Sequence, residues 1–182
     1  MRMAPLADPP LRIEVLPAAF VDGSLAAEIV RLCEEAYEEP IGGTLAAFES
    51  PVHVLGFLGN ELASHALWIP RPLRHGRKRL QSAYVEAVAT RPRLQGRGYA
   101  SAVMRAVAGH ITGFDIGALS PFDMRYYERL GWETWRGPLL VAMEGGAAPT
   151  PDEEVMILRF PHTPPLDLDG PLAAPWRPGE IW

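Results

Sequence analysis

The stretch RPRLQGRGYA, residues 91–100, combines arginine and glycine in a way that suits anion binding. It lies between the strand-like YVEAVAT, residues 84–90, and the helix-like SAVMRAVAGHI, residues 101–111. The first turn of a helix presents unpaired N–H groups and a positive dipole end, and glycine lets a phosphate approach the main chain closely. The stretch has neither the GK[ST] of a P-loop nor the third glycine of a dinucleotide fingerprint, so ATP and NAD are disfavoured as ligands.

Two spaced motifs in this part of the chain resemble those of a known superfamily. Arg93, Gly96 and Gly98 fit the pattern [QR]-x-x-G-x-[GA]. Further along, Tyr127 precedes Gly131 and Trp132 with the spacing Tyr-x-x-x-Gly-aromatic. The two motifs, in this order, resemble the acetyl-coenzyme A site of the GNAT superfamily of N-acetyltransferases.

A narrower resemblance extends to residue 182. It is carried by YVEAVA, GALS, GWETWRGP, TPDEE and WRPGEIW, which follow the order found in the aminoglycoside 2'-N-acetyltransferases. The chain up to about Ser50 matches that sub-family poorly. The resemblance implies an acetyl-coenzyme A co-substrate and no metal. It also implies direct acetyl transfer to an amine within a ternary complex.

The resemblance also implies which residues hold acetyl-coenzyme A. Main-chain amides from about Gln95 to Ala100 are expected to cradle the pyrophosphate, with Arg93 and Arg97 supplying charge nearby. The N–H of Val88, where the strand is expected to bulge, would bond the thioester carbonyl oxygen. The implied cofactor-binding residues are Val88, Arg93, Gln95, Gly96, Arg97, Gly98, Tyr99 and Ala100.

Acetyl transfer to nitrogen needs a neutral amine, and Glu86 is the candidate base. An alkylamine with a pKa of ~10.4 is neutral only about once in 10³ at pH 7. Glu86 lies in the middle of an apolar strand, where a carboxylate is costly unless it is partnered or used. The resemblance implies that it acts through water and also binds the substrate. The alternative is a strand glutamate that faces solvent.

The departing thiolate needs a proton, and the motif places Tyr127 as the acid, with Tyr126 as the second candidate. An aromatic residue on a helix is more often part of the core, so this role depends on the motif alone. Ser120 is a candidate substrate contact through its hydroxyl or main chain. It is equally suited to cap the helix that follows.

Acidic residues near both ends of the chain indicate a site for a cationic substrate. The resemblance points to Glu153, Glu180 and the carboxylate of Trp182 as groups that face ammonium ions of an aminosugar. Glu38 and Glu39 are candidate replacements for early family aspartates. Isolated exposed pairs contribute only ~0 to 1 kcal/mol, so several acids must converge in a cleft. The alternatives are another small amine or a protein N-terminus as acceptor, a non-catalytic coenzyme A sensor, or a merely acidic surface.

The pattern of elements predicts an α/β fold in which helices flank a mixed, mostly antiparallel central sheet. Helices are expected from a cap at Ser24 to about Ala36, over 100–111, and over 121–130 with Gly131 closing the last one. Hairpin turns are expected at Gly59-Asn60 and in RHGRK. The strands are expected within 11–17, 52–69, 80–90, 116–120, 138–143 and 154–160.

Length and composition limit the remaining possibilities. A chain of 182 residues fits one domain over residues 1–182, with the proline-rich segment 162–182 packed against it and contributing to the substrate site. The net charge of −5 disfavours nucleic acid as a partner. No apolar run reaches ~20 residues, so no membrane association is expected and the cytoplasm is the default location. Cys33 is the single cysteine, and a homodimer is common among the relatives.

Overall fold

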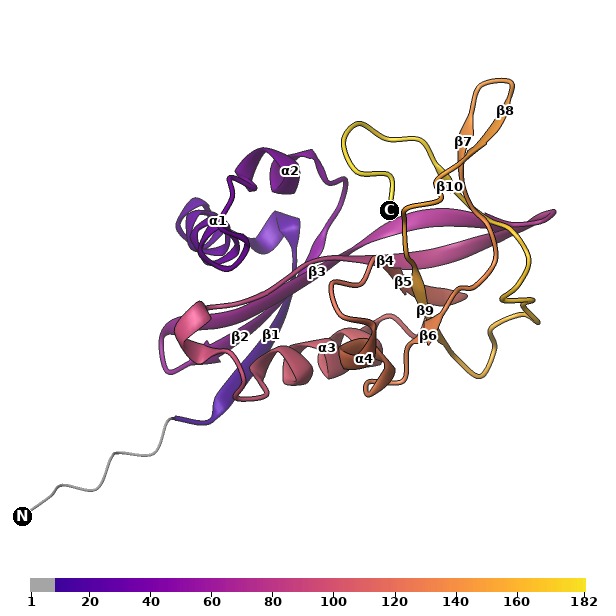
Figure 1. The fold of residues 1–182 in the computed structure, drawn as a ribbon. Coiled ribbons are helices and arrows are strands. Elements are labelled where there is room, and N and C mark those ends of the chain that lie inside the picture. The colour runs from indigo at the N-terminus through magenta and orange to yellow at the C-terminus, as the bar shows by residue number, and fades with distance from the viewer. Residues whose placement is uncertain (1–8) are drawn as a thin grey trace, which may run out of the picture.

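The computed structural model describes residues 9–182, in which one twisted sheet separates two layers of helices (Figure 1). Helices α1 (Gly23–Tyr37) and α2 (Gly42–Ala47) lie on one side of the sheet, and α3 (Tyr99–His110) and α4 (Met124–Glu128) lie on the other. This arrangement confirms the expected α/β fold class. The expected domain also includes residues 1–8, which lie outside the described residues.

Most neighbouring strands of the sheet are antiparallel. Two pairs are parallel, namely β4 with β5 and β7 with β10. The strand order is β6-β9-β5-β4-β3-β10-β7-β8, and β2 joins β1 to β3. The strands of the described chain are β1 (Leu11–Pro17), β2 (Val52–Leu58), β3 (Glu61–His75), β4 (Lys78–Thr90), β5 (Ile116–Leu119), β6 (Glu133–Thr134), β7 (Leu139–Met143), β8 (Gly146–Pro149), β9 (Met156–Arg159) and β10 (Leu172–Pro175).

Alternation along the strands builds one core on each face of the sheet. Leu55 and Leu67 belong to the cluster under α1, whereas Val54 and Trp68 belong to the cluster under α3. Successive side chains of a strand point to opposite faces, so apolar residues at consecutive positions are buried on both sides. The helices contribute Ile29, Leu32 and Cys33 from α1 and Val103, Met104 and Val107 from α3.

The feature that positions the site is the parting of β4 from β5. These strands pair only from Ser82 to Tyr84 on β4, so the rest of β4 runs on without β5 beside it. Ala87 then has a φ of +52°, and the register with β3 shifts between His65 and Leu67. One residue of β3 therefore faces two of β4, which is a β-bulge. This confirms the bulge expected beside Val88.

Two expected helix starts are wrong. Asp22 caps α1 in place of Ser24, because its carboxylate accepts a hydrogen bond from the Leu25 N–H at 2.9 Å. The helix expected from residue 121 begins only at Met124, since Asp123 is extended and its side chain accepts from the Tyr126 N–H at 3.3 Å. Ser120 is therefore not a helix cap.

Several short elements were not expected from the sequence: α2, β6, β8, β10 and the 3-10 turns η1 (Ala18–Phe20) and η2 (Pro92–Leu94). The strands GAAP and LAAP carry no alternation of apolar and polar residues, and they form only because β7 and β3 offer them unpaired edges. None of the helices that the structure describes has both the length and the apolar character needed to span a membrane.

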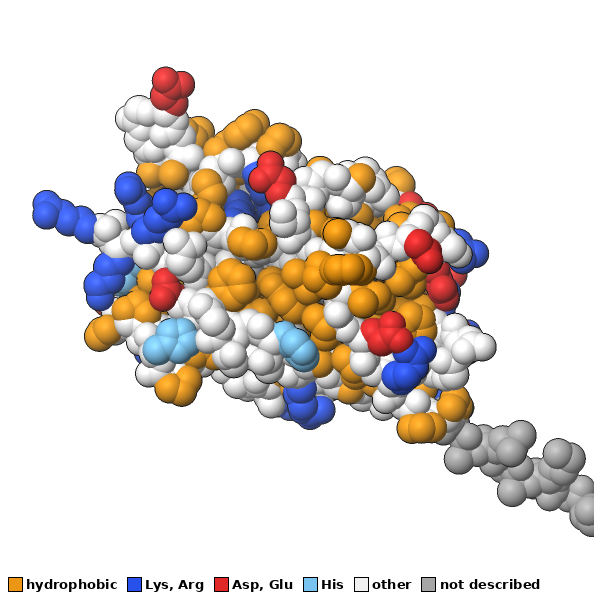
Figure 2. Space-filling model, turned by 180° about the vertical axis from the view of Figure 1, so that it is seen from behind, with side chains coloured by type: hydrophobic (Ala, Val, Ile, Leu, Met, Phe, Trp, Pro, Cys, Tyr) orange, Lys and Arg blue, Asp and Glu red, His pale blue; other side chains and the backbone are white. Residues whose placement is uncertain are grey.

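The C-terminal segment packs on the sheet on the same side as α1 and α2 (Figure 1). Trp182 is 2% exposed and its indole N–H donates to the Thr150 hydroxyl at 2.8 Å, whereas Trp176 is 60% exposed. The basic block at residues 74–79 forms the projecting β3–β4 hairpin, and Lys and Arg side chains gather at that end of the molecule (Figure 2). Arg71, which precedes this block on β3, is instead buried.

Candidate active site

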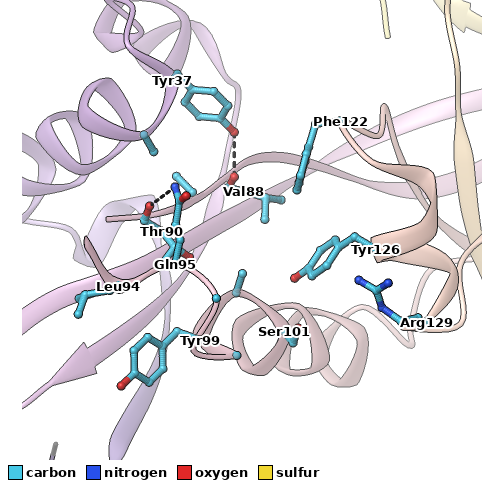
Figure 3. A pocket seen from close by; sticks show the side chains of 15 residues that line it. Tyr37, Val88, Thr90, Leu94, Gln95, Tyr99, Ser101, Phe122, Tyr126 and Arg129 are labelled. Carbon is cyan, nitrogen blue, oxygen red and sulfur yellow. Dashed lines mark hydrogen bonds between the residues drawn. The ribbon is translucent and has the colours of Figure 1, made fainter. Parts of the chain in front are cut away.

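Two hollows meet at the free part of β4. A groove of about 640 Å³ runs from β4 to the start of α3, and a chamber of about 280 Å³ lies on the other side of Val88. Tyr37, Val88 and Phe122 line both hollows. Figure 3 shows the groove with Tyr37 reaching to Val88 from one side and Tyr126 projecting into it from another. The two hollows therefore share a boundary at the bulge.

The main chain at the end of the groove is shaped by two glycines. Gly96 has a φ of +74° and Gly98, which precedes the first residue of α3, has a φ of +85°. Apart from the glycine and its two chain neighbours, no heavy atom of residues 9–182 lies within 4 Å of where a Cβ would stand at either position. Such a turn before a helix N-terminus suits a diphosphate, because its main-chain N–H groups and the positive end of the helix dipole both attract the anion. Glycine leaves no side chain between the main chain and the phosphates.

Most of the expected cofactor residues line this groove. Those that do are Val88, Gln95, Gly96, Gly98, Tyr99 and Ala100. Arg93 and Arg97 lie outside the lining, and Arg93 forms an ion pair with Glu61. Among the described residues, the cation that lines the groove is Arg129, beside Tyr126 (Figure 3), and no motif points to it.

The chamber is acidic. Glu39, Glu86 and Glu180 line it, and within the described chain its lining contains no Lys, Arg or His. Three further candidate site residues, Ser120, Tyr127 and Trp182, also line it. Glu153 lies outside the lining, and Glu38 ends α1 in the left-handed conformation. Of the two early glutamates, Glu39 is therefore the one in the chamber.

Glu86 is a largely buried carboxylate with a cationic neighbour. Its side chain is 17% exposed, and Oε1 lies 2.7 Å from Nη2 of Arg177. Burial raises the pKa of Glu86 above its ordinary value, while the positive charges of Arg177 and Arg71 act in the opposite direction. The glutamate does not face open solvent, so this alternative is excluded.

The two tyrosines of α4 point into different hollows. Tyr127 lines the chamber and is 2% exposed, whereas Tyr126 lines the groove. Their rings meet edge to face with centroids 4.9 Å apart. Burial raises the pKa of each phenol above its ordinary value, so both hydroxyls stay protonated at neutral pH and can donate a proton or hydrogen bond.

Buried histidines support the bulge from β2 and β3. Nδ1 of His65 lies 2.9 Å from the carbonyl oxygen of Ala87, and Nε2 of His65 lies 3.0 Å from Nδ1 of His53. Because a carbonyl only accepts, His65 carries its proton on Nδ1, and Nε2 accepts from His53. Desolvation lowers the pKa of His65 to about 3, so the ring is neutral.

Sequence reasoning missed Tyr37, Phe122 as a shared wall, and the arginines Arg71 and Arg177. Tyr37 ends an ordinary amphipathic helix, and nothing in its neighbourhood distinguishes it from a core aromatic. Arg177 lies inside the motif WRPGEIW, so the motif could have drawn attention to it. Within residues 9–182, no three His, Cys, Asp or Glu side chains gather in a way that could hold a metal ion.

The fold is similar to that of solved acetyltransferases. The GNAT family N-acetyltransferase YhbS from Escherichia coli, solved in complex with CoA, has a TM-score of 0.64 and 14% identity, covering 96% of this chain and 93% of that one. A GCN5-related N-acetyltransferase from Kribbella flavida has a TM-score of 0.57 and 21% identity, covering 71% of this chain and 35% of that one.

Sequence comparison gives a closer relationship. The aminoglycoside 2'-N-acetyltransferase of Mycolicibacterium fortuitum is 35% identical over 128 residues, which is 66% of each protein. The chain therefore spans slightly less than two thirds of that relative's length. The family model for the acetyltransferase (GNAT) domain matches residues 13–135, which include Glu86, the glycine turn and Tyr127. With more than half of its length matched, the chain belongs to the GNAT acetyltransferase family.

Proposed function

We propose that the protein transfers an acetyl group from acetyl-coenzyme A to an amine of a polycationic aminosugar, by direct transfer with both substrates bound. The observation that carries this proposal is the chamber with three glutamates and no basic residue in its lining, directly beside the groove at the glycine turn. The resemblance of the chain to the aminoglycoside 2'-N-acetyltransferase of Mycolicibacterium fortuitum supports it.

The groove fits coenzyme A by its main chain. The turn at Gly96 and Gly98 and the first amides of α3 are suited to bind the diphosphate. The part of β4 that is not paired with β5 offers main-chain N–H and C=O groups to the rest of the coenzyme A molecule. When bound, the donor supplies an activated thioester. Val88 lies where the groove meets the chamber, so its main-chain N–H is the proposed donor to the thioester oxygen.

Glu86 is the proposed base. The acceptor enters as an ammonium ion, which the acidic chamber attracts, and one proton must leave its nitrogen before that nitrogen can bond the acetyl carbon. A carboxylate whose pKa is raised by burial is a stronger base than an exposed one. The carbon–sulfur bond then breaks, and Tyr127 is the proposed donor of the proton to sulfur.

Glu39 and Glu180 are proposed to hold the remaining ammonium groups of the substrate. The chamber, at about 280 Å³, is just below the usual ~300–1,000 Å³ of small-molecule sites. It therefore fits the amine-bearing end of the acceptor, with the rest outside. Ser120, Glu153 and the carboxylate of Trp182 are proposed as further contacts to the substrate. We also propose a single domain over residues 1–182, a homodimer and a cytoplasmic location.

The test is a titration of the protein with acetyl-coenzyme A by calorimetry, followed by thiol-release assays with aminoglycosides, small monoamines and an N-terminal peptide. We expect 1:1 binding and the highest kcat/KM with an aminoglycoside. Glu86→Gln should lower kcat/KM about 10²- to 10⁴-fold at pH 7 without weakening cofactor binding.

The matched control is Glu144→Gln, which changes an exposed glutamate in the β7–β8 turn and should leave both measurements unchanged. Turnover of monoamines or the peptide in preference to aminoglycosides would replace the proposed acceptor. Binding of acetyl-coenzyme A with no turnover of any amine would favour a coenzyme A sensor.

A further inference from the structure

The base candidate is contacted by a residue more than ninety positions away. Arg177, in the C-terminal segment, is the residue whose Nη2 lies 2.7 Å from Oε1 of Glu86, and its side chain is 20% exposed. In Figure 1 the C-terminal segment returns toward β4 on the side of α1 and α2. Arg177 is not among the residues that line the chamber, although it contacts Glu86, which is.

Several contacts fix Arg177 in this place. Its Nε donates to the carbonyl oxygen of Glu180 at 2.6 Å. Its guanidinium carbon lies 5.7 Å from the centroid of the Tyr84 ring and 5.8 Å from that of Phe48. A planar guanidinium that bonds through its edge and stacks on aromatic rings has a defined orientation. The pair with Glu86 is therefore unlike a mobile surface ion pair.

A second arginine, which is buried, anchors the same segment. Arg71 is 5% exposed, its Nη2 donates to the carbonyl oxygen of Pro175 at 2.9 Å, and it lies 5.0 Å from the centroid of Tyr84. Desolvation, followed by the charge of Arg177, lowers the pKa of Arg71 to about 10. Two guanidinium groups thus lie close to each other, and Glu86 is the carboxylate that balances them in the buried cluster.

The titratable groups that influence the pKa of Glu86 lie on several elements around it. Arg71 on β3 and Arg177 favour its carboxylate form, Glu180 opposes it, and Tyr84 on β4 and Tyr37 on α1 are neutral phenols. Burial alone favours the protonated acid, which is useless as a base. A cation within about 4 Å is what keeps a buried carboxylate ionised at neutral pH.

We propose that Arg177 is a positioning residue for Glu86: it holds Oε1 and keeps the carboxylate ionised, so the base is complete only when the C-terminal segment is docked on the sheet. This inference rests on the proposed function, because it assumes that Glu86 is the base. The segment is then part of the catalytic apparatus and does more than border the acceptor site.

The test compares Arg177→Met, Arg177→Lys and the wild type. The pKa of the Glu86 carboxyl is measured by ¹³C NMR, with its resonance assigned from Glu86→Gln, and the pH profile of kcat/KM is measured alongside. Loss of the cation in Arg177→Met should raise the pKa of Glu86 by about one unit or more and move the acidic limb of the profile by the same amount. Arg177→Lys keeps the positive charge, so the pKa of Glu86 and the acidic limb of the profile should both stay close to their wild-type positions.

Arg136→Met is the matched control, because it removes an arginine from an exposed pair with Asp169 and should shift neither quantity. The indole N–H resonance of Trp182 reports whether the segment is docked. An unchanged Glu86 pKa in Arg177→Met would overturn the inference. A raised pKa without a shift of the kcat/KM profile would instead remove Glu86 as the base, and with it the proposed function, while leaving the electrostatic link in place.

Discussion

The Tyr37 hydroxyl at the end of α1 donates a hydrogen bond to the carbonyl oxygen of Val88, with 3.0 Å between the two oxygens (Figure 3). This bond joins a helix on one face of the sheet to the part of β4 that β5 leaves free. Both residues line the groove and the chamber. Tyr37 therefore fixes the peptide between Val88 and Ala89 at the boundary of the two hollows, where the proposed function places the acetyl group.

Tyr37→Phe tests this contact, because it keeps the ring and removes only the donor. A hydrogen bond of this kind contributes about 0.5–1.5 kcal/mol, so we expect kcat/KM to fall about two- to tenfold. Steady-state rates at varied acetyl-coenzyme A and amine concentrations measure the effect, and thermal unfolding provides the control for stability. Wild-type kinetics in this variant would show that the bond does not position the site.

The glycine turn predicts a difference between two alanine substitutions in the same region. Gly98→Ala adds a side chain at a φ of +85°, where alanine is strained, and places a methyl group over the turn. We expect the Kd of coenzyme A, measured by calorimetry, to rise about tenfold or more. Gly109→Ala, inside α3 with no atom within 4 Å of the new Cβ, should leave the Kd unchanged and raise helix stability. Equal effects of the two would contradict the phosphate turn.

The tyrosine pair predicts two different kinetic defects. Tyr127 lines the chamber with Glu86, so Tyr127→Phe should lower kcat by about 10²-fold with little change in the KM of acetyl-coenzyme A. Tyr126 lines the groove, so Tyr126→Phe should mainly raise that KM. Rapid-quench measurement of a single turnover separates the chemical step from product release. The opposite assignment of the defects would make Tyr126 the proton donor.

Local patterns predicted most of the sheet and the groove. The strand at residues 11–17, the hairpin turns and the glycine turn all depend on contacts or conformations close in sequence, so the sequence reveals them. Glu86 and Tyr127 were chosen as candidates because short motifs surround them, and both line the chamber. The boundaries of α4 were missed because Asp123 and Ser120 are both good caps, and the choice depends on the path of Pro121 and Phe122 over the chamber.

The charged contacts around Glu86 could not be predicted in the same way. Arg177 and Arg71 appear in sequence as ordinary cations, and Arg71 lies only three residues before the basic block at residues 74–79, whose Lys and Arg side chains are exposed on the hairpin. Their partnership with Glu86 depends on β10 inserting between β3 and β7, and LAAP has no strand pattern that predicts it. Long-range pairing decides such sites, because it determines which buried charges meet.

The histidine pair behind the bulge predicts how stability depends on pH. The native pKa of His65 is lowered to about 3 and that of His53 is also lowered, whereas both protonate near 6.5 when the chain is unfolded. The unfolded state thus binds more protons between these values, so the free energy of unfolding falls as the pH drops below about 6.5. Each histidine contributes a slope of up to about 1.4 kcal/mol per pH unit.

His65→Gln removes this proton-binding site and should flatten the slope between pH 6.5 and 5, where most carboxylates are still ionised. His110→Gln, an exposed histidine at the end of α3, should keep the wild-type slope and is the control. Urea unfolding at several pH values measures the slopes. Because His65 donates to the carbonyl of Ala87 beside Glu86, His65→Gln should also lower kcat/KM at pH 7. A slope in His65→Gln as steep as in the wild type would mean that the buried ring is already protonated in the folded protein.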